Sequence, residues 1–155
     1  RRHTRLQGDW SSDVCSSDLL YHPDATDDHG AYFAGTAADF IAWLPGILEV
    51  NIVTSHQVLN HLIAVDGDRA EGEVYVQAFH LADLGDGCYS KTVAGGRYLD
   101  RYERRDGQWK FSHRKIVADY EFETPAQAPA DEHGSGTPRG GHGSADPSAD
   151  FFTLI

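Results

Sequence analysis

The chain has 155 residues, of which 40% are hydrophobic and 24% charged, and its formal net charge is −11 at neutral pH. This length suffices for one domain with one substantial core, and the acidic balance argues against nucleic acid or an anionic membrane as the main partner. No apolar run approaches the roughly 20 residues needed to cross a bilayer, and the beginning lacks the layout of a signal peptide, so a cytoplasmic protein is expected. Cys15 and Cys88 are the only cysteines, which excludes a disulfide framework or a zinc knuckle.

Residues 1–19 are predicted to lie outside the fold. The stretch from Asp9 to Leu19 (DWSSDVCSSDL) has no apolar periodicity and repeats Ser-Ser-Asp, and it resembles the translation of a sequencing adapter, a contaminant of assembled metagenomic genes. The alternative is a natural flexible tail. We therefore set this segment aside as non-native and expect the domain to occupy residues 20–123.

One short strand and one helix are expected first. Residues 21–35 are polar and rich in turn formers, and residues 24–30 are compatible with a short edge strand. Thr36 is placed as a helix N-cap, with Asp39 at the position that Glu or Gln fills in a capping box. The apolar residues that follow recur at helical spacing: Phe40, Ile41, Leu44, Ile47 and Leu48. Pro45 is expected to bend this helix or end it early.

Four long strands are expected next, because apolar or aromatic residues alternate with polar ones at period two. They are residues 53–65, 69–80, 91–105 and 108–120. Asp66-Gly67 and Asp106-Gly107 are placed as hairpin turns, residues 81–90 as a loop, and Gly95-Gly96 as a bulge that sharpens the curve of the sheet. The predicted fold class is α+β, with one curved antiparallel or mixed sheet wrapped around the helix.

From Thr124 the composition changes to Pro, Gly, Ala and Ser. Residues 124–155 are therefore predicted to form a flexible C-terminal tail. Its apolar end, residues 151–155 (FFTLI), is expected to dock onto its own subunit or a neighbour.

Residues 96–114 (GRYLDRYERRDGQWKFSHR), taken with residues 54–80, resemble the SnoaL-like family of the nuclear-transport-factor-2-like superfamily. This group includes scytalone dehydratase, hexachlorocyclohexane dehydrochlorinase and bile acid 7α-dehydratase. The resemblance implies a cone-shaped α+β barrel that works without cofactor or metal. It also implies one or two helices before Leu20 that close the cone and donate a catalytic aspartate. Nothing in residues 1–19 fits that role, so the chain is expected to be truncated, with its N-terminal helices missing.

Three residues are assigned to catalysis through this resemblance. His56 matches the histidine that acts as general base, a role suited to imidazole because its ordinary pKa is about 6.5. His80 matches a second pocket residue, and pairing across the Asp66-Gly67 turn would bring both histidines to one cavity. Arg114 matches a pocket arginine that would hold a carboxylate, an enolate or a leaving group. The alternatives are a buried structural histidine, a surface histidine and a cross-strand ion pair, respectively.

Two further residues are assigned to substrate binding. Asn60 shares the strand parity of His56, whereas His61 has the opposite parity and is expected to point outward. Asp28 is the second binding candidate. It belongs to a group of acidic and histidine residues, Asp24, Asp27, Asp28 and His29, but no further ligands follow at a recognisable spacing. No metal is therefore expected.

The function expected is a cofactor-independent lyase or isomerase acting on a small, largely apolar cyclic molecule. The alternatives are a non-catalytic module that binds a hydrophobic ligand and a structural subunit resembling the small subunit of ring-hydroxylating dioxygenases. A homodimer or homotrimer is expected, since related proteins use the outer sheet face as an interface. The aromatic candidates for that interface are Tyr98, Tyr102, Trp109 and Phe111.

Overall fold

The computed structural model describes residues 20–128, 138, 140, 146–148 and 151. Its elements are β1 (Tyr21–Asp28), β2 (Ala34–Thr36), α2 (Ala37–Leu48), β3 (Asn51–Asp66), β4 (Arg69–Gly85), β5 (Cys88–Arg105) and β6 (Gln108–Ala126). The prediction that residues 1–19 stay out of the core concerns residues outside this set, as does most of the proposed tail. None of the helical segments in the described part has the length and apolar character required to cross a membrane.

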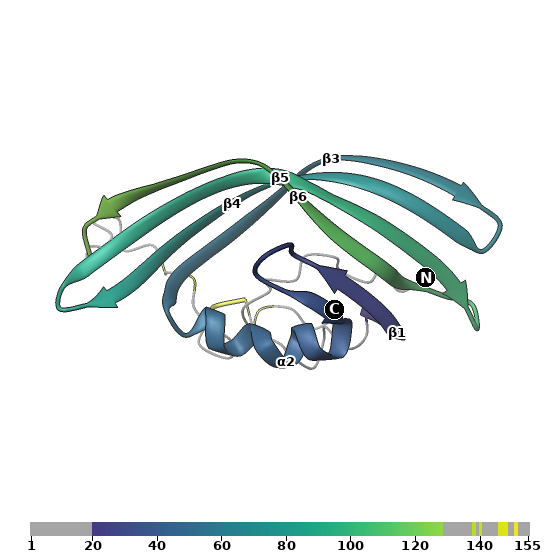
Figure 1. The fold of residues 1–155 in the computed structure, drawn as a ribbon, viewed down its shortest axis with the longest axis horizontal. Helices are drawn as coiled ribbons and strands as arrows, with labels where there is room; N and C mark the ends of the chain where they lie inside the picture. The colour runs from purple at the N-terminus through teal and green to yellow at the C-terminus, as the bar shows by residue number, and fades with distance from the viewer. Residues whose placement is uncertain (1–19, 129–137, 139, 141–145, 149–150, 152–155) are drawn as a thin grey trace.

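The strands form one six-stranded sheet in the order β2-β1-β6-β5-β4-β3. The strands β3 to β6 pair antiparallel along their length, whereas β1 runs parallel to β6 and antiparallel to β2. The long strands arch over α2 and β1, which lie together beneath them (Figure 1). The prediction of a curved, mixed sheet wrapped around a helix is confirmed.

The β4–β5 hairpin is longer than predicted. The prediction of a loop at residues 81–90 is wrong, because β4 continues to Gly85 and β5 begins at Cys88. Asp86 and Gly87 form the turn with positive φ angles of 52° and 74°, the conformation that a tight hairpin turn of this kind requires. The glycine and aspartate residues of this segment therefore serve one tight turn. β6 likewise runs past the predicted end at residue 120 to Ala126.

β1 is an interior strand, and the expectation of an edge strand at residues 24–30 is wrong. β2 supplies that edge, after a turn in which the His29 N–H donates to the Phe33 carbonyl at 2.7 Å. Gly30 takes φ +63° in this turn, a conformation that glycine adopts without a steric penalty. The turn sequence was too irregular to be read as a hairpin from its residue pattern.

Helix α2 begins as predicted, and of the two effects expected of Pro45 the early end does not occur. The Thr36 hydroxyl accepts from the Asp39 N–H at 3.1 Å and donates to the Asp39 carboxylate at 2.6 Å, which satisfies one of the free N–H groups of the first turn. Pro45 does not end the helix, which continues to Leu48. The Pro45 carbonyl still accepts from the Glu49 N–H at 3.1 Å, so the last turn of the helix keeps this hydrogen bond.

The core lies between the arched sheet and the layer of β1 and α2. One cluster of buried residues joins β1, α2 and β6: Tyr21, Ala25, Ala37, Ile41 and Phe111. A second joins β4 and β5: Val74, Val76 and Tyr98. We call the sheet face that carries these side chains the inner face. Of the aromatic residues considered for a subunit interface, Tyr98 and Phe111 are buried here and Tyr102 packs against Phe111, whereas Trp109 is 41% exposed.

The predicted bulge is present at Gly95-Gly96, where the pairing of β5 with β6 shifts register. A Cβ atom at Gly96 would lie 2.3 Å from the Val117 carbonyl oxygen. Because this oxygen belongs to a paired strand, Gly96→Ala is expected to destabilise the fold by about 1–3 kcal/mol, measured by urea unfolding. The control is Gly46→Ala in α2, where a Cβ meets nothing within 4 Å and helix propensity favours alanine. Equal stability of the two variants would contradict the close approach at Gly96.

Candidate functional site

His56 and His80 lie together on the inner face. The pairing of β3 with β4 sets Thr54 opposite His80 and His56 opposite Ala78, as the turn at Asp66-Gly67 predicted. The two imidazole rings meet edge to face, with centroids 5.1 Å apart and planes at 72°. Two groups that can each carry or release a proton near neutral pH are thus in contact at one point of the sheet.

The surroundings of His80 favour its neutral form. Burial lowers the pKa of His80 below the ordinary 6.5, and the negative charge of Glu121 acts in the opposite direction without cancelling the effect. Its Nδ1 atom is buried and has no hydrogen-bond partner in the described structure. A neutral imidazole with an unpaired nitrogen can accept or donate a proton.

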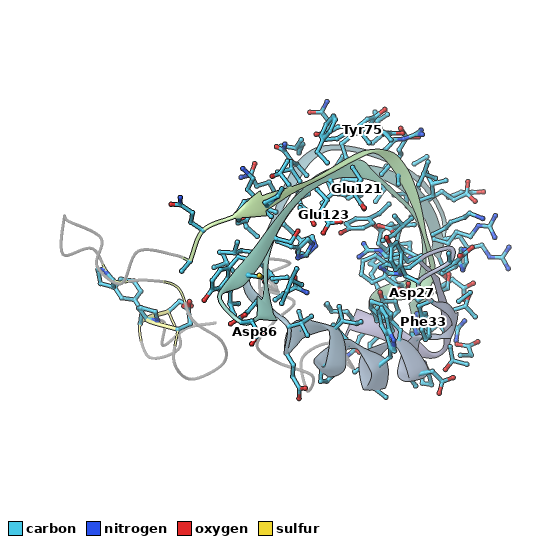
Figure 2. The ribbon with its side chains drawn as sticks, turned by 60° about the vertical axis from the view of Figure 1, so that its left-hand side comes forward. Asp27, Phe33, Tyr75, Asp86, Glu121 and Glu123 are labelled. Atoms are coloured by element: carbon cyan, nitrogen blue, oxygen red, sulfur yellow. The ribbon has the colours of Figure 1, made fainter. Side chains whose placement is uncertain are left out.

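Two glutamates face the histidines across the sheet, and the sequence analysis missed them. Glu121 stands opposite Ala94, and Ala94 opposite Ala78, the partner of His56. The side chains between His56 and Glu121 are therefore two alanines, over three strand spacings or about 14 Å. Figure 2 shows Glu121 and Glu123 beneath the arch. Ala78 and Ala94 thus separate His56 from Glu121, and Thr92 separates His80 from Glu123.

The bulge explains why these glutamates were missed. Strict alternation from Arg114 along β6 places even-numbered residues on the inner face. Beyond the register shift the odd-numbered residues face inward, because Glu121 pairs with Ala94. Tyr120 lies on the opposite face, where its ring covers the position that a Cβ of Gly95 would occupy.

Arg114 is fully engaged by a neighbouring strand. Its guanidinium donates to both Asp100 carboxylate oxygens, at 2.7 and 2.8 Å, and the two residues are 5% and 2% exposed. It also lies 4.1 Å from the Tyr98 ring centre and 4.4 Å from that of Phe111. Burial alone would lower the pKa of Arg114, but the hydrogen bonds and charge of Asp100 outweigh it and raise the pKa. The structure thus shows the alternative considered for this residue, a cross-strand ion pair.

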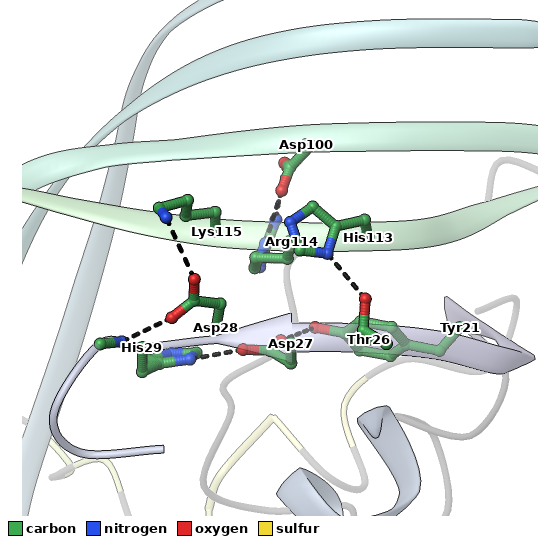
Figure 3. A network of polar contacts seen from close by, with 10 residues as sticks. Tyr21, Thr26, Asp27, Asp28, His29, Asp100, His113, Arg114 and Lys115 are labelled. Atoms are coloured by element: carbon green, nitrogen blue, oxygen red, sulfur yellow. Dashed lines mark hydrogen bonds and ion pairs between the residues drawn. The ribbon is translucent and has the colours of Figure 1, made fainter. Parts of the chain in front are cut away.

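Arg114 shares the inner face with the histidines but not their position. It pairs with Asp100, which pairs with Gly72 on β4. Gly72 precedes His80 by eight residues, or roughly 26 Å along the strand. The structure brings His56 and His80 together and sets Arg114 apart, in the wall over β1 (Figure 3).

The two substrate-binding candidates do not lie with the histidines. A register shift between Val58 and His61 leaves Leu59 and Asn60 together against Tyr75 and sets His61 opposite Val74. His61, rather than Asn60, therefore shares the face of His56, because a bulge changes the parity of all later residues. Asn60 is exposed.

Asp28 is directed away from the inner face. Its carboxylate pairs with Lys115 at 3.2 Å and accepts from the Gly30 N–H at 2.9 Å (Figure 3). Asp27, which pairs in register with Arg114, is the buried residue of the two. The acidic group considered for metal binding is dispersed in the same way, since Asp24 binds Arg105 at 2.6 Å. No three His, Cys, Asp or Glu side chains gather as metal ligands in the described part of the chain.

A sequence profile of the SnoaL-like domain matches residues 16–115 of the chain. The chain belongs to the SnoaL-like domain family. No curated protein sequence matches the chain, so the remaining comparisons are with solved structures.

Three solved structures illustrate the likeness of this SnoaL-like domain. A proposed scytalone dehydratase from Novosphingobium aromaticivorans is 23% identical, with 81% of this chain and 88% of that chain covered and a TM-score of 0.60. Hexachlorocyclohexane dehydrochlorinase LinA-type3 from Novosphingobium barchaimii is 22% identical, with coverages of 74% and 75% and a TM-score of 0.58. A Kribbella flavida protein is 23% identical, with coverages of 67% and 75% and a TM-score of 0.59. At these identities the likeness establishes the cone-shaped nuclear-transport-factor-2-like fold.

Proposed function

We propose that this SnoaL-like domain is a cofactor-independent lyase or isomerase that acts by general acid–base catalysis on a small, largely apolar cyclic molecule. His56 takes a proton from a carbon next to an activating group. His80 stabilises the charge that develops or helps a hydroxyl or halide to leave.

The observation that carries this proposal is the contact between His56 and His80 on the inner face. The lowered pKa of His80 keeps its imidazole neutral near pH 7, so that its N–H can donate a hydrogen bond to the charge that develops on the substrate. Ala78 and Ala94, which adjoin His56 on the inner face, offer an apolar surface on which a ring can lie. The dehydratase and dehydrochlorinase of the same fold, at 23% and 22% identity, make elimination the reaction to test first.

Arg114 has a different part in this proposal from the one that the family resemblance implied. Its guanidinium donors are directed at Asp100, so holding a substrate anion would require breaking a buried ion pair. We assign Arg114 to the wall of the cone, and the chemistry to the histidine pair.

The proposal is tested by incubating the purified chain with cyclic β-hydroxy ketones and polychlorinated cyclohexanes. Loss of water or release of chloride is followed by mass spectrometry and chloride titration. The expected result is turnover of at least one class that disappears in His56→Ala. Tight binding without product would support the hydrophobic-ligand-binding alternative, and neither binding nor turnover would support a structural subunit; both outcomes overturn the proposed activity.

The lowered pKa of His80 has a consequence for stability. Between the folded pKa and the unfolded value of about 6.5, the unfolded chain binds more protons, so stability rises with pH. The contribution is fully present above about pH 6.5 and is lost as the pH falls through the folded pKa. His80→Gln is expected to flatten the dependence of the unfolding free energy on pH below about pH 6.5. An unchanged slope in this variant would contradict burial of the imidazole.

We also propose that the chain self-associates as a homodimer or homotrimer. β3 is the outermost strand of the sheet, and several of its apolar side chains are 54% to 67% exposed: Val58, Leu59, Leu62, Ile63 and Val65. An unpaired edge with exposed apolar residues favours association. Sedimentation equilibrium at tens of micromolar is expected to give two or three chains per particle, and a monomer would contradict the proposal.

A further inference from the structure

The outermost strand of the sheet, β3, is paired on one side only among the described residues. It is 16 residues long, and a register shift between Val58 and His61 divides it into two parts. The second part pairs regularly with β4 up to the turn, and its apolar side chains Leu62, Ile63 and Val65 are 54% to 67% exposed. In Figure 1 this end of β3 lies at the periphery of the arch, away from α2. The open side of the strand is therefore accessible to another chain.

The hairpin turn at Gly67, which takes φ +58°, determines which backbone groups face the open side. A two-residue turn closes on a pair of residues that exchanges both backbone hydrogen bonds, and in an antiparallel ladder such pairs alternate with pairs that exchange none. The closing pair here is Asp66 with Arg69. The residues that direct their N–H and C=O groups to the open side are therefore Val65, Ile63 and His61. Free groups of this kind are a template for another strand.

The charge distribution allows a second copy of the chain to approach this side. The net charge is −11, but Asp66 is the only Asp, Glu, Lys or Arg residue of β3, which also lacks proline. The carboxylates that adjoin this stretch on β4, Glu71 and Glu73, bind Arg101 and Arg97 at 3.4 and 3.8 Å. Across two paired copies they would lie three strand spacings apart, about 14 Å, beyond the screening length of about 8 Å at physiological salt. The strand thus lacks the lysine and proline residues that keep sheet edges apart, and like charges do not replace them.

We propose that two copies of this chain pair antiparallel through β3, around a two-fold axis at Ile63, so that their sheets become one continuous sheet. The inference rests on the proposed self-association and specifies its contact and its number of copies. Ile63 exchanges both backbone hydrogen bonds with Ile63 of the second copy, and His61 of each copy pairs with Val65 of the other. A two-fold contact uses the same surface on both subunits, so the assembly closes at a dimer.

The backbone and the side chains favour the same register. Ile63 is the middle one of the three residues whose backbone groups face the open side, so neither the bulge nor the turn enters the pairing. On the inner face Ile63 meets its own copy, beside small and apolar residues of β4: Ala70, Gly72 and Val74. On the opposite face Leu62 of each copy meets Ala64 of the other. Apolar pairs of this kind stabilise neighbouring strands.

Sedimentation equilibrium at tens of micromolar tests the pairing with the variant Ile63→Pro. Proline removes the N–H that faces the open side, which the bonds between β3 and β4 do not use. Because each copy loses one hydrogen bond, the dissociation constant of the dimer is expected to rise about tenfold or more. The matched control is Phe122→Ser, which removes a ring that is 64% exposed on the opposite face of the sheet. This control is expected to leave the dimer intact.

The other outcomes overturn the pairing in ways that can be told apart. A trimer of the parent chain, or a dimer that Phe122→Ser dissociates and Ile63→Pro does not, would leave self-association standing with a different interface. A monomeric parent chain would overturn the proposed self-association as well. Turnover that depends on His56 is measured separately, so the proposed catalytic activity does not depend on these results.

Cysteine cross-linking tests the register, and it decides the matter if Ile63→Pro fails to fold. In a chain whose Cys15 and Cys88 are replaced by serine, Ile63→Cys sets two Cα atoms about 5.5 Å apart across a hydrogen-bonded pair, within the range that a disulfide spans. Ala64→Cys is the matched control, because its two copies lie on the diagonal, about 8 Å apart. Under mild oxidation we expect cross-linked dimers of Ile63→Cys and few of Ala64→Cys. Equal cross-linking of both variants, or none in either, would overturn the pairing.

Discussion

Replacing His56 by alanine is expected to lower the turnover number of the proposed elimination by about 10²- to 10⁴-fold, the usual worth of a general base. The KM is expected to change little, because the imidazole interacts with the proton in the transition state more than with the bound substrate. The fold should persist, since His56 is only partly buried at the inner face. Circular dichroism and urea unfolding of the variant check this point.

The matched control is His61→Ala, on the same strand and the same face. His61 stands opposite Val74, on the far side of the register shift from His56, and is exposed. It is expected to keep the parent rate. Equal losses in both variants would mean that the strand is disturbed generally, and unchanged turnover in His56→Ala would contradict the mechanism while leaving the fold in place.

The second large effect is expected at the buried ion pair. Arg114→Met removes the guanidinium partner of the Asp100 carboxylate, which is 2% exposed and still accepts from the Tyr102 hydroxyl at 2.9 Å. Removing one member of a buried pair costs about 3–5 kcal/mol. The free energy of unfolding in urea should fall by that amount, and Asp100→Asn should behave in the same direction.

The control for this prediction is Arg101→Met. Arg101 pairs with Glu71 at 3.4 Å, but their side chains are 68% and 75% exposed, and exposed pairs contribute about 0–1 kcal/mol. The double variant Arg114→Met with Asp100→Leu is expected to recover much of the loss, because it removes both charges together. Similar losses of unfolding free energy in Arg101→Met and Arg114→Met would contradict the expectation that burial determines the cost of breaking the ion pair.

Much of the architecture could be predicted because it is encoded locally. Alternation at period two predicts four strands, the Asp-Gly turns at Asp66 and Asp106 predict the pairing of β3 with β4 and of β5 with β6, and Thr36 predicts the helix start. The contact of His56 with His80 follows from one turn and one register. A cross-strand ion pair was the alternative considered for Arg114, and the structure identifies its acidic partner as Asp100 of the same hairpin.

The rest depended on information that lies far away in the sequence. The inner position of His61, in place of Asn60, and that of Glu121 result from bulges, which depend on the partner strand rather than on the residues themselves. The burial of Asp27 arises from the parallel pairing of β1 with β6, which joins segments over 80 residues apart. The residue pattern within β1 alone does not predict a contact with a strand so far away in the sequence.

The bulge at Gly95-Gly96 also has an evolutionary consequence. Because it reverses which residues of β6 face inward, deletion of one residue beside it would turn Glu121 and Glu123 outward and bring Tyr120 and Phe122 beneath the arch. A single codon lost or gained would thus convert an acidic wall into an aromatic one without any substitution. The polarity of the inner face beyond the bulge is thus open to change by insertion and deletion, and residues at equal alignment columns there need not perform equal chemistry.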